Sequence, residues 1–563
     1  MRRVLSTSSQ LIFEASSMNV KAANGLVRIL KKEGVGWVST FPTNIFTNAC
    51  GEEGVENLMV RDERFAVAVA DGFSRVSDGK RFGVCSLMGG LNAAGTEMAY
   101  GAIAQAFEDS TPLLCLTDGV PGDRAGLERL NIEDGFMPVS KWTGYINRGS
   151  RVPEFMRRAF TMLRTGRPSP VLLQLPGGLE EYEEDNYPYE PVKGWRSQAD
   201  PGDVRQAVRA IREARKPMIF AGQGVFYADA CGELRRLSEL LQLPVLTTLK
   251  GKSSFPEDHP LSLGVTGPPA ERFLKTSDLV FTVGYGFNPS QFAHVIPRGK
   301  RIVQLALEES DVNRGYPVDH VVLGDAKLVL GQMIEEAERQ GAVKRPGLLE
   351  EIEAVKKEKM AKYESFLASD ERPINPYRVY NEMMGVLDPS NSFVTHESGN
   401  TRDQLVTVYE ARIPHGFLGW GNVSTLGFGL GASMGARLAF PERQVVSVTG
   451  DAGFGYQVGN YEVLVRNKMG ITTVHINNSG FGGYGPGFWG PGHSPYTSKV
   501  TPSDIVNTAK AVEGLGIASE RVEDPDEIAP ALRRALKLNG SGKPAFIEVI
   551  CKQHPVYGGW MRA

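Results

Sequence analysis

Amphipathic stretches alternate with short, uninterrupted apolar runs along most of the chain. In its first part, apolar residues recur at helical spacing over residues 22–34 and again over 155–166. Apolar runs at 82–88, 112–119 and 170–176 are too short to form helices of their own. Such runs are typical of strands buried on both faces, so the alternation predicts a parallel sheet covered by helices on both sides.

The same alternation returns twice more, and stretches without periodicity separate the three series. Residues 177–203 are acidic, aromatic and proline-containing, which is typical of a linker, and residues 333–373 combine charged helix with a second linker. We therefore predict an α/β protein of three doubly wound domains with mainly parallel sheets, over residues 18–185, 200–340 and 373–555.

Composition and charge are those of an ordinary globular protein, and they disfavour several partners. The chain of 563 residues is 41% hydrophobic and 23% charged with a net charge of -3, so no basic field points to nucleic acid. No apolar run approaches the ~18–20 residues of a membrane span. The five cysteines are scattered without a CxxC pair, which favours a reducing cytoplasm. For the basic, serine-rich residues 1–17 we expect a disordered leader or an upstream start rather than a transit peptide.

Polar residues follow two neighbouring strands of the last series, at the point where each strand ends. Over residues 444–480, a strand ending at Gly450-Asp451, a helix over residues 459–469, and a strand ending at Asn477-Asn478 form one βαβ unit. Its strands are parallel, so Asp451 and Asn478 lie at the same edge of the sheet, where ligands bind. Their oxygens suit Mg²⁺, and a diphosphate would supply further ligands. Each motif alone is typical of a turn, but the pair at this spacing favours a metal–diphosphate site.

This GDA…NN pattern resembles the metal–diphosphate motif of thiamine diphosphate (ThDP) enzymes. From about residue 18 to about residue 555, the chain resembles the branch with acetohydroxyacid synthase, pyruvate oxidase, oxalyl-CoA decarboxylase, 2-hydroxyacyl-CoA lyase and benzaldehyde lyase. The resemblance implies ThDP and Mg²⁺ as cofactors, and the domain order pyrimidine-binding, central, diphosphate-binding. It implies a homodimer or homotetramer with sites between subunits. It also implies Asp451, Asn478 and the backbone carbonyl of Gly480 as metal ligands.

The segment NLMVRDERFAVAVADGFSRV resembles the family's stretch with a catalytic glutamate. The resemblance implies that Glu63 hydrogen-bonds the pyrimidine ring and promotes removal of the proton from the thiazolium C2. A glutamate in a surface turn is the alternative interpretation. The chain departs from the family at Asp62, where histidine is common, and at Arg64, where acetohydroxyacid synthases usually carry glutamine, which weakens a strict synthase assignment.

Three stretches of the third domain resemble cofactor-binding parts of the family. VTHESGNTRDQL and GDAGFGYQVGNYEV are closer to the acyl-CoA members than to the synthases, and GNVSTLGFGLGASMGARLA matches a stretch whose bulky apolar residue supports the bent cofactor. Leu426 occupies that position, and ordinary core packing is its alternative role. The residues implied to bind the cofactor are Gly399, Asn400, Thr401, Ser424, Leu426, Gly450, Ala452 and Gly453.

The strand that ends at Asn477-Asn478 runs into a stretch rich in glycine and aromatic residues, HINNSGFGGYGPGFWG. Its aromatic residues could wall an apolar substrate pocket, and its glycines would let the loop move; a disordered loop is the alternative. Asn92, in a loop that resembles the family's substrate side, is a further candidate, or a turn asparagine. No histidine occurs in the first 258 residues, which disfavours the pyruvate decarboxylase type. The substrate candidates are Asn92, Phe481, Tyr484, Phe488 and Trp489.

The central domain of relatives binds FAD, binds an ADP moiety, or is empty. Here FAGQGV lacks the third glycine of a dinucleotide fingerprint, and GYGFNPSQF lacks the acidic start common after this strand, which disfavours FAD and a nicotinamide oxidoreductase. We expect an enzyme that decarboxylates and ligates small 2-oxo acids, as acetolactate synthase does. The alternative is a lyase or decarboxylase of an acyl-CoA, and the remote one a non-catalytic ThDP-binding protein.

Overall fold

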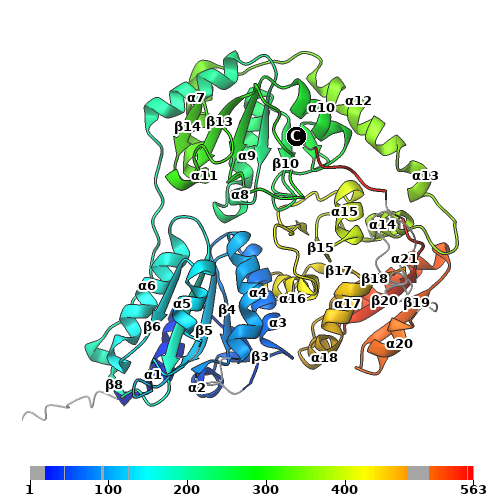
Figure 1. The fold of residues 1–563 in the computed structure, drawn as a ribbon. Helices are drawn as coiled ribbons and strands as arrows, with labels where there is room; N and C mark the ends of the chain where they lie inside the picture. Colours follow the sequence, from blue (N-terminus) through cyan, green and yellow to red (C-terminus); the bar gives the residue numbers. More distant parts are fainter. Residues whose placement is uncertain are drawn as a thin grey trace, which may run out of the picture.

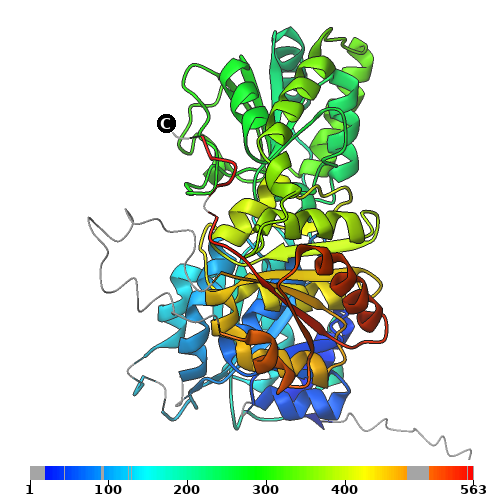
Figure 2. The ribbon, with the colours of Figure 1, turned by 90° about the vertical axis from the view of Figure 1, so that its right-hand side faces the viewer.

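Three six-stranded sheets organise the chain in the computed structural model (Figure 1). The structure describes residues 19–42, 45–90, 94–124, 126–128, 130–478, 506–554 and 556–561. Every strand pair within the three sheets is parallel. Helices flank the sheets, as Figures 1 and 2 show. The predicted fold class, three doubly wound α/β domains, is therefore confirmed.

The first sheet has the strand order β3-β2-β4-β5-β7-β6. Its middle strands are buried along nearly their whole length, as expected for apolar runs covered by helices on both faces. The elements are β1 (Asn19–Val20), α1 (Ala22–Lys32), β2 (Trp37–Thr40), α2 (Ile45–Glu53), β3 (Glu56–Met59), α3 (Glu63–Arg75), β4 (Gly83–Leu87), α4 (Ala94–Glu108), β5 (Leu113–Gly119), α5 (Ile132–Phe136), η2 (Met137–Val139), β6 (Trp142–Tyr145), η3 (Gly149–Arg151), α6 (Val152–Arg164), β7 (Pro170–Pro176), β8 (Tyr182–Glu183) and η4 (Glu184–Asn186).

The central sheet has the order β11-β10-β9-β12-β13-β14 and its own core. The order reverses beside β9, the kind of position where open α/β sheets form crevices. Its elements are α7 (Pro201–Glu213), β9 (Pro217–Ala221), α8 (Gly224–Tyr227), α9 (Cys231–Leu241), β10 (Val245–Thr247), β11 (Ser262–Gly264), α10 (Pro268–Thr276), β12 (Leu279–Val283), β13 (Arg301–Ala306), η5 (Glu309–Asp311), β14 (His320–Leu323), α11 (Ala326–Gln340), α12 (Leu348–Ala361) and α13 (Glu364–Leu367).

The third sheet has the order β16-β15-β17-β18-β20-β19. The sequence predicted one helix here, over residues 459–469, which corresponds to α18 in the structure. A second helix, α17, precedes it and starts at Asp451. A 3₁₀ turn separates the two helices, and Asn460 in that turn bonds the side chains of Gln457 and Asp62. The elements are α14 (Pro376–Val386), β15 (Ser392–His396), α15 (Asn400–Val408), β16 (Phe417–Leu418), α16 (Phe428–Ala439), β17 (Gln444–Gly450), α17 (Asp451–Gln457), η6 (Val458–Asn460), α18 (Tyr461–Arg466), β18 (Thr472–Asn477), α20 (Thr508–Glu513), β19 (Ala518–Val522), η8 (Pro525–Glu527), α21 (Ile528–Asn539) and β20 (Ala545–Ile550).

Helix α3 of the first domain packs closely on α16 of the third (Figure 1). Small residues allow the approach: a Cβ at Gly72 would collide with the backbone of Ala432, and one at Gly435 would collide with the backbone of Phe73. Larger side chains would push the helices apart. The contact therefore sets where the N-terminal end of α3, which carries Glu63, lies relative to the third domain.

Buried charges join α3 to the central domain. Arg75 lies 2.6 Å from Asp71 and 2.8 Å from Asp109, and Lys250 of the central domain reaches Asp109 over 3.2 Å. Buried ions are tolerated when each has a partner, so this set specifies one relative position of the two domains. Along the described stretches, no helix combines the length and the apolar character needed to cross a bilayer.

Candidate cofactor site

Asp451 and Asn478 lie side by side at the carboxyl edge of the third sheet. β17 and β18 are neighbours and pair in parallel as far as Gly450 and Ile476. Asp451 begins α17 directly after β17, and the backbone N–H of Asn478, directly after β18, donates to Asp451 Oδ2 over 3.4 Å. The two strand ends thus bring a carboxylate and an amide to one place, where a hard cation could take both oxygens.

The two asparagines after β18 have different partners. The side-chain amide of Asn477 donates to Glu548 Oε1 over 2.6 Å and to the carbonyl oxygen of Val506 over 2.9 Å. The same buried carboxylate of Glu548 accepts the backbone N–H of Thr508 over 3.1 Å. Asn477 and Glu548 therefore connect β18 to the segment at Val506 and Thr508, whereas Asn478 donates its backbone N–H to Asp451.

A cavity of about 600 Å³ opens at this edge of the sheet. Its walls include the connection from β15 to α15, the loop before α16 and the connection from β17 to α17. Parallel topology places these three connections together although they are distant in sequence. The predicted cofactor and metal residues that line the cavity are Gly399, Asn400, Thr401, Ser424, Leu426, Gly450, Asp451, Ala452, Gly453 and Asn478.

The chemistry of this lining fits a diphosphate with a divalent cation. Helix α15 begins at the cavity with Gly399 as N-cap and no capping side chain, so its first backbone N–H groups can bind an anion. The side-chain amide nitrogen of Asn400 is buried and has no hydrogen-bond partner among the described residues. A buried donor of this kind is costly unless a ligand satisfies it. Asp451 and Asn478 complete an oxygen-rich set for Mg²⁺.

Glu63 begins α3 and is almost fully buried, with 5% of its surface exposed. The preceding Asp62 caps the helix, because its Oδ1 accepts the N–H of Phe65 over 2.8 Å. Burial raises the pKa of Glu63, and the negative charge of Asp62 adds to the shift. A Cβ at Gly95 would collide with the Glu63 carboxylate, which explains the glycine there. Because Asp62 caps α3, the aspartate at this position, where the family commonly has histidine, has a structural reason.

The start of α3 touches the third domain of its own chain. The guanidinium of Arg64 donates to the carbonyl oxygen of Leu426 and lies 4.7 Å from the ring of Tyr456. Asn460 donates to Asp62 over 3.0 Å. Arg64 therefore connects the segment with Glu63 to the wall of the cavity, although Glu63 itself is not part of the described lining.

Known proteins resemble nearly the whole chain. Models of the thiamine pyrophosphate (that is, ThDP) enzymes match in three parts: the N-terminal TPP-binding domain at residues 20–138, the central domain at 204–333, and the C-terminal TPP-binding domain at 397–549. The chain is 30% identical to glyoxylate carboligase of Escherichia coli O157:H7, over 95% of this chain and 93% of that protein. The chain belongs to the thiamine diphosphate-dependent enzymes.

Two other relatives of this ThDP enzyme are acetolactate synthases. It is 29% identical to the probable acetolactate synthase large subunit of Methanocaldococcus jannaschii, over 94% of this chain and 92% of that protein. It is 26% identical to the large subunit of acetolactate synthase isozyme 3 of Escherichia coli, over 94% of both. The predicted family and the use of ThDP are therefore confirmed.

Sequence reasoning missed a buried arginine in the cavity of the ThDP enzyme. Arg402 holds Asp403 through two of its nitrogens and donates to Ser424 Oγ over 3.1 Å. Its guanidinium lies 3.3 Å from the ring of Phe292, which comes from the central domain. Its place directly after Thr401 was the only available signal. The further lining residues that the sequence did not single out are Gln291, Phe292, Ser398, Arg402, Asp403, Gln404, Asn422, Ile476 and Tyr557.

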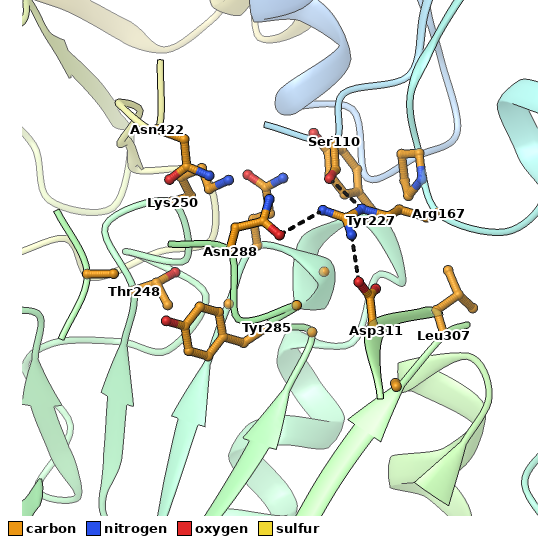
Figure 3. Close-up of a pocket in the computed structure, with 18 of the residues that line it drawn as sticks. Ser110, Arg167, Tyr227, Thr248, Lys250, Tyr285, Asn288, Leu307, Asp311 and Asn422 are labelled. Carbon is orange, nitrogen blue, oxygen red and sulfur yellow. Dashed lines mark hydrogen bonds and ion pairs between the residues drawn. The ribbon is translucent and has the colours of Figure 1, made fainter. Parts of the chain in front are cut away.

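A second cavity lies at the carboxyl edge of the central sheet, beside the first domain (Figure 3). Its volume is about 120 Å³, below the ~300–1,000 Å³ usual for ligand pockets. Arg167 of the first domain reaches Asp311 over 2.6 Å and Ser110 over 2.9 Å. A Cβ at Gly222 or at Gly224 would collide with the backbone of Gly284, so these glycines serve loop packing. FAD or an ADP moiety as the occupant of the central domain stays a prediction.

Several predicted residues lie outside the part of the chain that the structure describes. They include the third proposed metal ligand and all the proposed substrate residues. Their roles stay predictions: Asn92, Gly480, Phe481, Tyr484, Phe488 and Trp489.

Proposed function

We propose that this enzyme decarboxylates a small 2-oxo acid and joins the remaining fragment to a second carbonyl compound. The observation that carries the proposal is one cavity lined by every described residue implied to bind ThDP and its metal. The names of the relatives support the substrate class, since one group makes acetolactate and the other ligates glyoxylate. Cleavage of an acyl-CoA is the second candidate, favoured by the wording of VTHESGNTRDQL.

The residues divide the work between two ends of the cofactor. Asp451 and Asn478 would hold Mg²⁺, with the carbonyl of Gly480 as a further ligand, and the start of α15 would bind the diphosphate. Leu426 would support the bent cofactor, and Glu63 would move a proton at the pyrimidine. When bound, ThDP supplies a nucleophile that adds to a carbonyl carbon and accepts the electron pair released by C–C cleavage.

Product analysis tests the reaction. The protein is purified with ThDP and Mg²⁺ and supplied separately with pyruvate, with glyoxylate and with a 2-hydroxyacyl-CoA. We expect CO₂ and a carboligation product from one of the 2-oxo acids. The flavin absorption spectrum of the same sample shows whether the central domain binds FAD. Turnover of the acyl-CoA alone would replace the first proposal with the second.

We further propose that the enzyme is at least a homodimer and assembles into a homotetramer. Apolar side chains are exposed on two neighbouring elements of the first domain: Met98 and Tyr100 of α4 at 60% and 39%, and Met137 of η2 at 58%. Water-exposed apolar surface of this kind is usual where a second subunit packs. The five cysteines are unbridged, which supports the cytoplasm as compartment.

Subunit mixing tests whether Glu63 of one chain serves Asp451 of its partner, as the resemblance implies. Glu63→Gln and Asp451→Asn proteins are each purified, then mixed, dissociated and reassembled. If the sites are shared between subunits, about half of the reassembled dimers contain one chain of each variant. One of the two sites in such a dimer is intact, so we expect about a quarter of wild-type activity to return. No recovery would show that each chain completes its own site, as the contact between Arg64 and Leu426 in one chain would allow.

A further inference from the structure

A buried carboxylate, Glu397, stands behind the wall of the cofactor cavity and does not line it. It directly follows β15, and only 2% of its surface is exposed. Its Oε1 accepts the N–H of Gly429 over 2.7 Å, and its Oε2 accepts the N–H of Gly427 over 3.1 Å. Gly427, directly after Leu426, is the N-cap of α16, and Gly429 lies in its first turn. The carboxylate thus caps this helix and complements the positive end of its dipole.

The same residue touches the two other segments that build the cavity. Its carbonyl oxygen accepts the hydroxyl of Thr401 over 3.0 Å. Its side chain fills the space beside Gly453 of α17, where a Cβ would collide with it. Its backbone N–H bonds the carbonyl oxygen of Val448 in β17 over 2.8 Å. Glu397 is therefore in contact with every segment that carries a predicted cofactor-binding residue.

We propose that Glu397 is a positioning residue of the cofactor site, whose carboxylate holds Leu426 in place relative to Thr401 and Gly453. It acts through these residues and needs no contact with ThDP. The inference rests on ThDP binding in this cavity and goes beyond the proposed function, because it holds for any substrate. A glutamine of the same shape would fill this space equally well, so packing alone does not require a charge. The glutamine would, however, offer only one accepting oxygen instead of two.

The surroundings of Glu397 shift the pKa of its carboxyl group. Burial raises its pKa to about 7, against the hydrogen bonds from the backbone N–H groups of Gly427, Gly429 and Ser398 and the charge of Arg64 on α3. Burial holds the pKa of the neighbouring His396 well below its usual value, and burial raises the pKa of Tyr461 on α18. Near pH 6 the wild-type side chain is thus a neutral acid that resembles the amide, and near pH 8 it is the carboxylate that accepts both N–H groups.

ThDP binding by Glu397→Gln is the test. Calorimetric titration of the full-length apoprotein with ThDP, at saturating Mg²⁺, gives the Kd at pH 6 and pH 8. We expect the Kd to rise about tenfold to a hundredfold over wild type at pH 8, the effect of losing one charge-assisted hydrogen bond, and the difference to narrow at pH 6. The matched control is Glu336→Gln, a buried acid of α11 in the central domain, which should bind ThDP like wild type at both pH values.

Equal ThDP affinity of Glu397→Gln and wild type at pH 8 would overturn the inference. So would a loss of affinity of the same size at pH 6 and pH 8, because this would indicate disturbed packing. If the glutamine variant does not fold, Glu397→Asp keeps the charge but is one methylene shorter; weakened binding that still depends on pH supports the role, and wild-type binding refutes it. Failure of the wild type to bind ThDP would instead remove the cofactor assignment itself.

Discussion

Replacing Glu63 with glutamine is expected to leave ThDP bound but to slow exchange of its C2 proton by about a hundredfold to ten-thousandfold, the usual contribution of a positioned acid or base. Glu63 is 5% exposed, and burial raises its pKa, which favours a group that both accepts and returns a proton. An amide of the same shape keeps the start of α3 intact, since Asp62 provides the cap. Hydrogen–deuterium exchange at C2, quenched with acid and followed by NMR, measures the rate.

Glu56→Gln is the matched control for this experiment. Glu56 is an exposed acid at the start of β3 in the same domain, so its variant should show wild-type exchange and wild-type ThDP affinity. Unchanged C2 exchange in Glu63→Gln would refute the catalytic assignment. A loss of ThDP binding in that variant would show that Glu63 holds the cofactor instead of acting on it.

Replacing Asp451 with asparagine is expected to raise the Kd for ThDP, measured with Mg²⁺ present, by at least about a hundredfold. Removing even an outer partner of a metal ligand costs about tenfold to a hundredfold in metal affinity, and a charged ligand should cost more. Without that carboxylate, the remaining proposed protein ligands of the cation would all be neutral oxygens, so the protein would hold the metal and the diphosphate less tightly. Calorimetric titration with ThDP, with and without Mg²⁺, separates metal-dependent from metal-independent binding.

Asp526→Asn provides the control, because this carboxylate lies in η8 at the surface of the same domain and pairs with Arg378. It should leave the Mg²⁺ dependence of ThDP binding unchanged. If Asp451→Asn still binds ThDP in the same Mg²⁺-dependent way, then Asp451 is a turn residue and the metal lies elsewhere. The two variants also test different ends of the cofactor, since Glu63→Gln should fail only in proton exchange and Asp451→Asn already in binding.

Sequence patterns within single segments predicted the sheets and the pairing of the two strands of the βαβ unit. The strand run 444–449 and the run 471–476 became neighbouring parallel strands, because a short crossover helix forces that arrangement, and Asp451 therefore meets Asn478. The predicted helix between them is present as α18, but the preceding α17 was missed, because Gly453 and Gly455 weaken its sequence signal. Tertiary contacts, including the side chain of Glu397 against Gly453, support it there.

The sequence by itself therefore determined the three α/β domains, the family, and the residues that end its strands, since each depends on local periodicity or on a short motif. Only the tertiary structure showed that Arg402 is buried against Phe292 of another domain, that Arg64 reaches Leu426, and that the glycines of FAGQGV pack against Gly284. These facts depend on how domains distant in sequence approach each other. Glu397 belongs with them, because a glutamate after a strand becomes a positioning group only when another helix presents its free N–H groups to it.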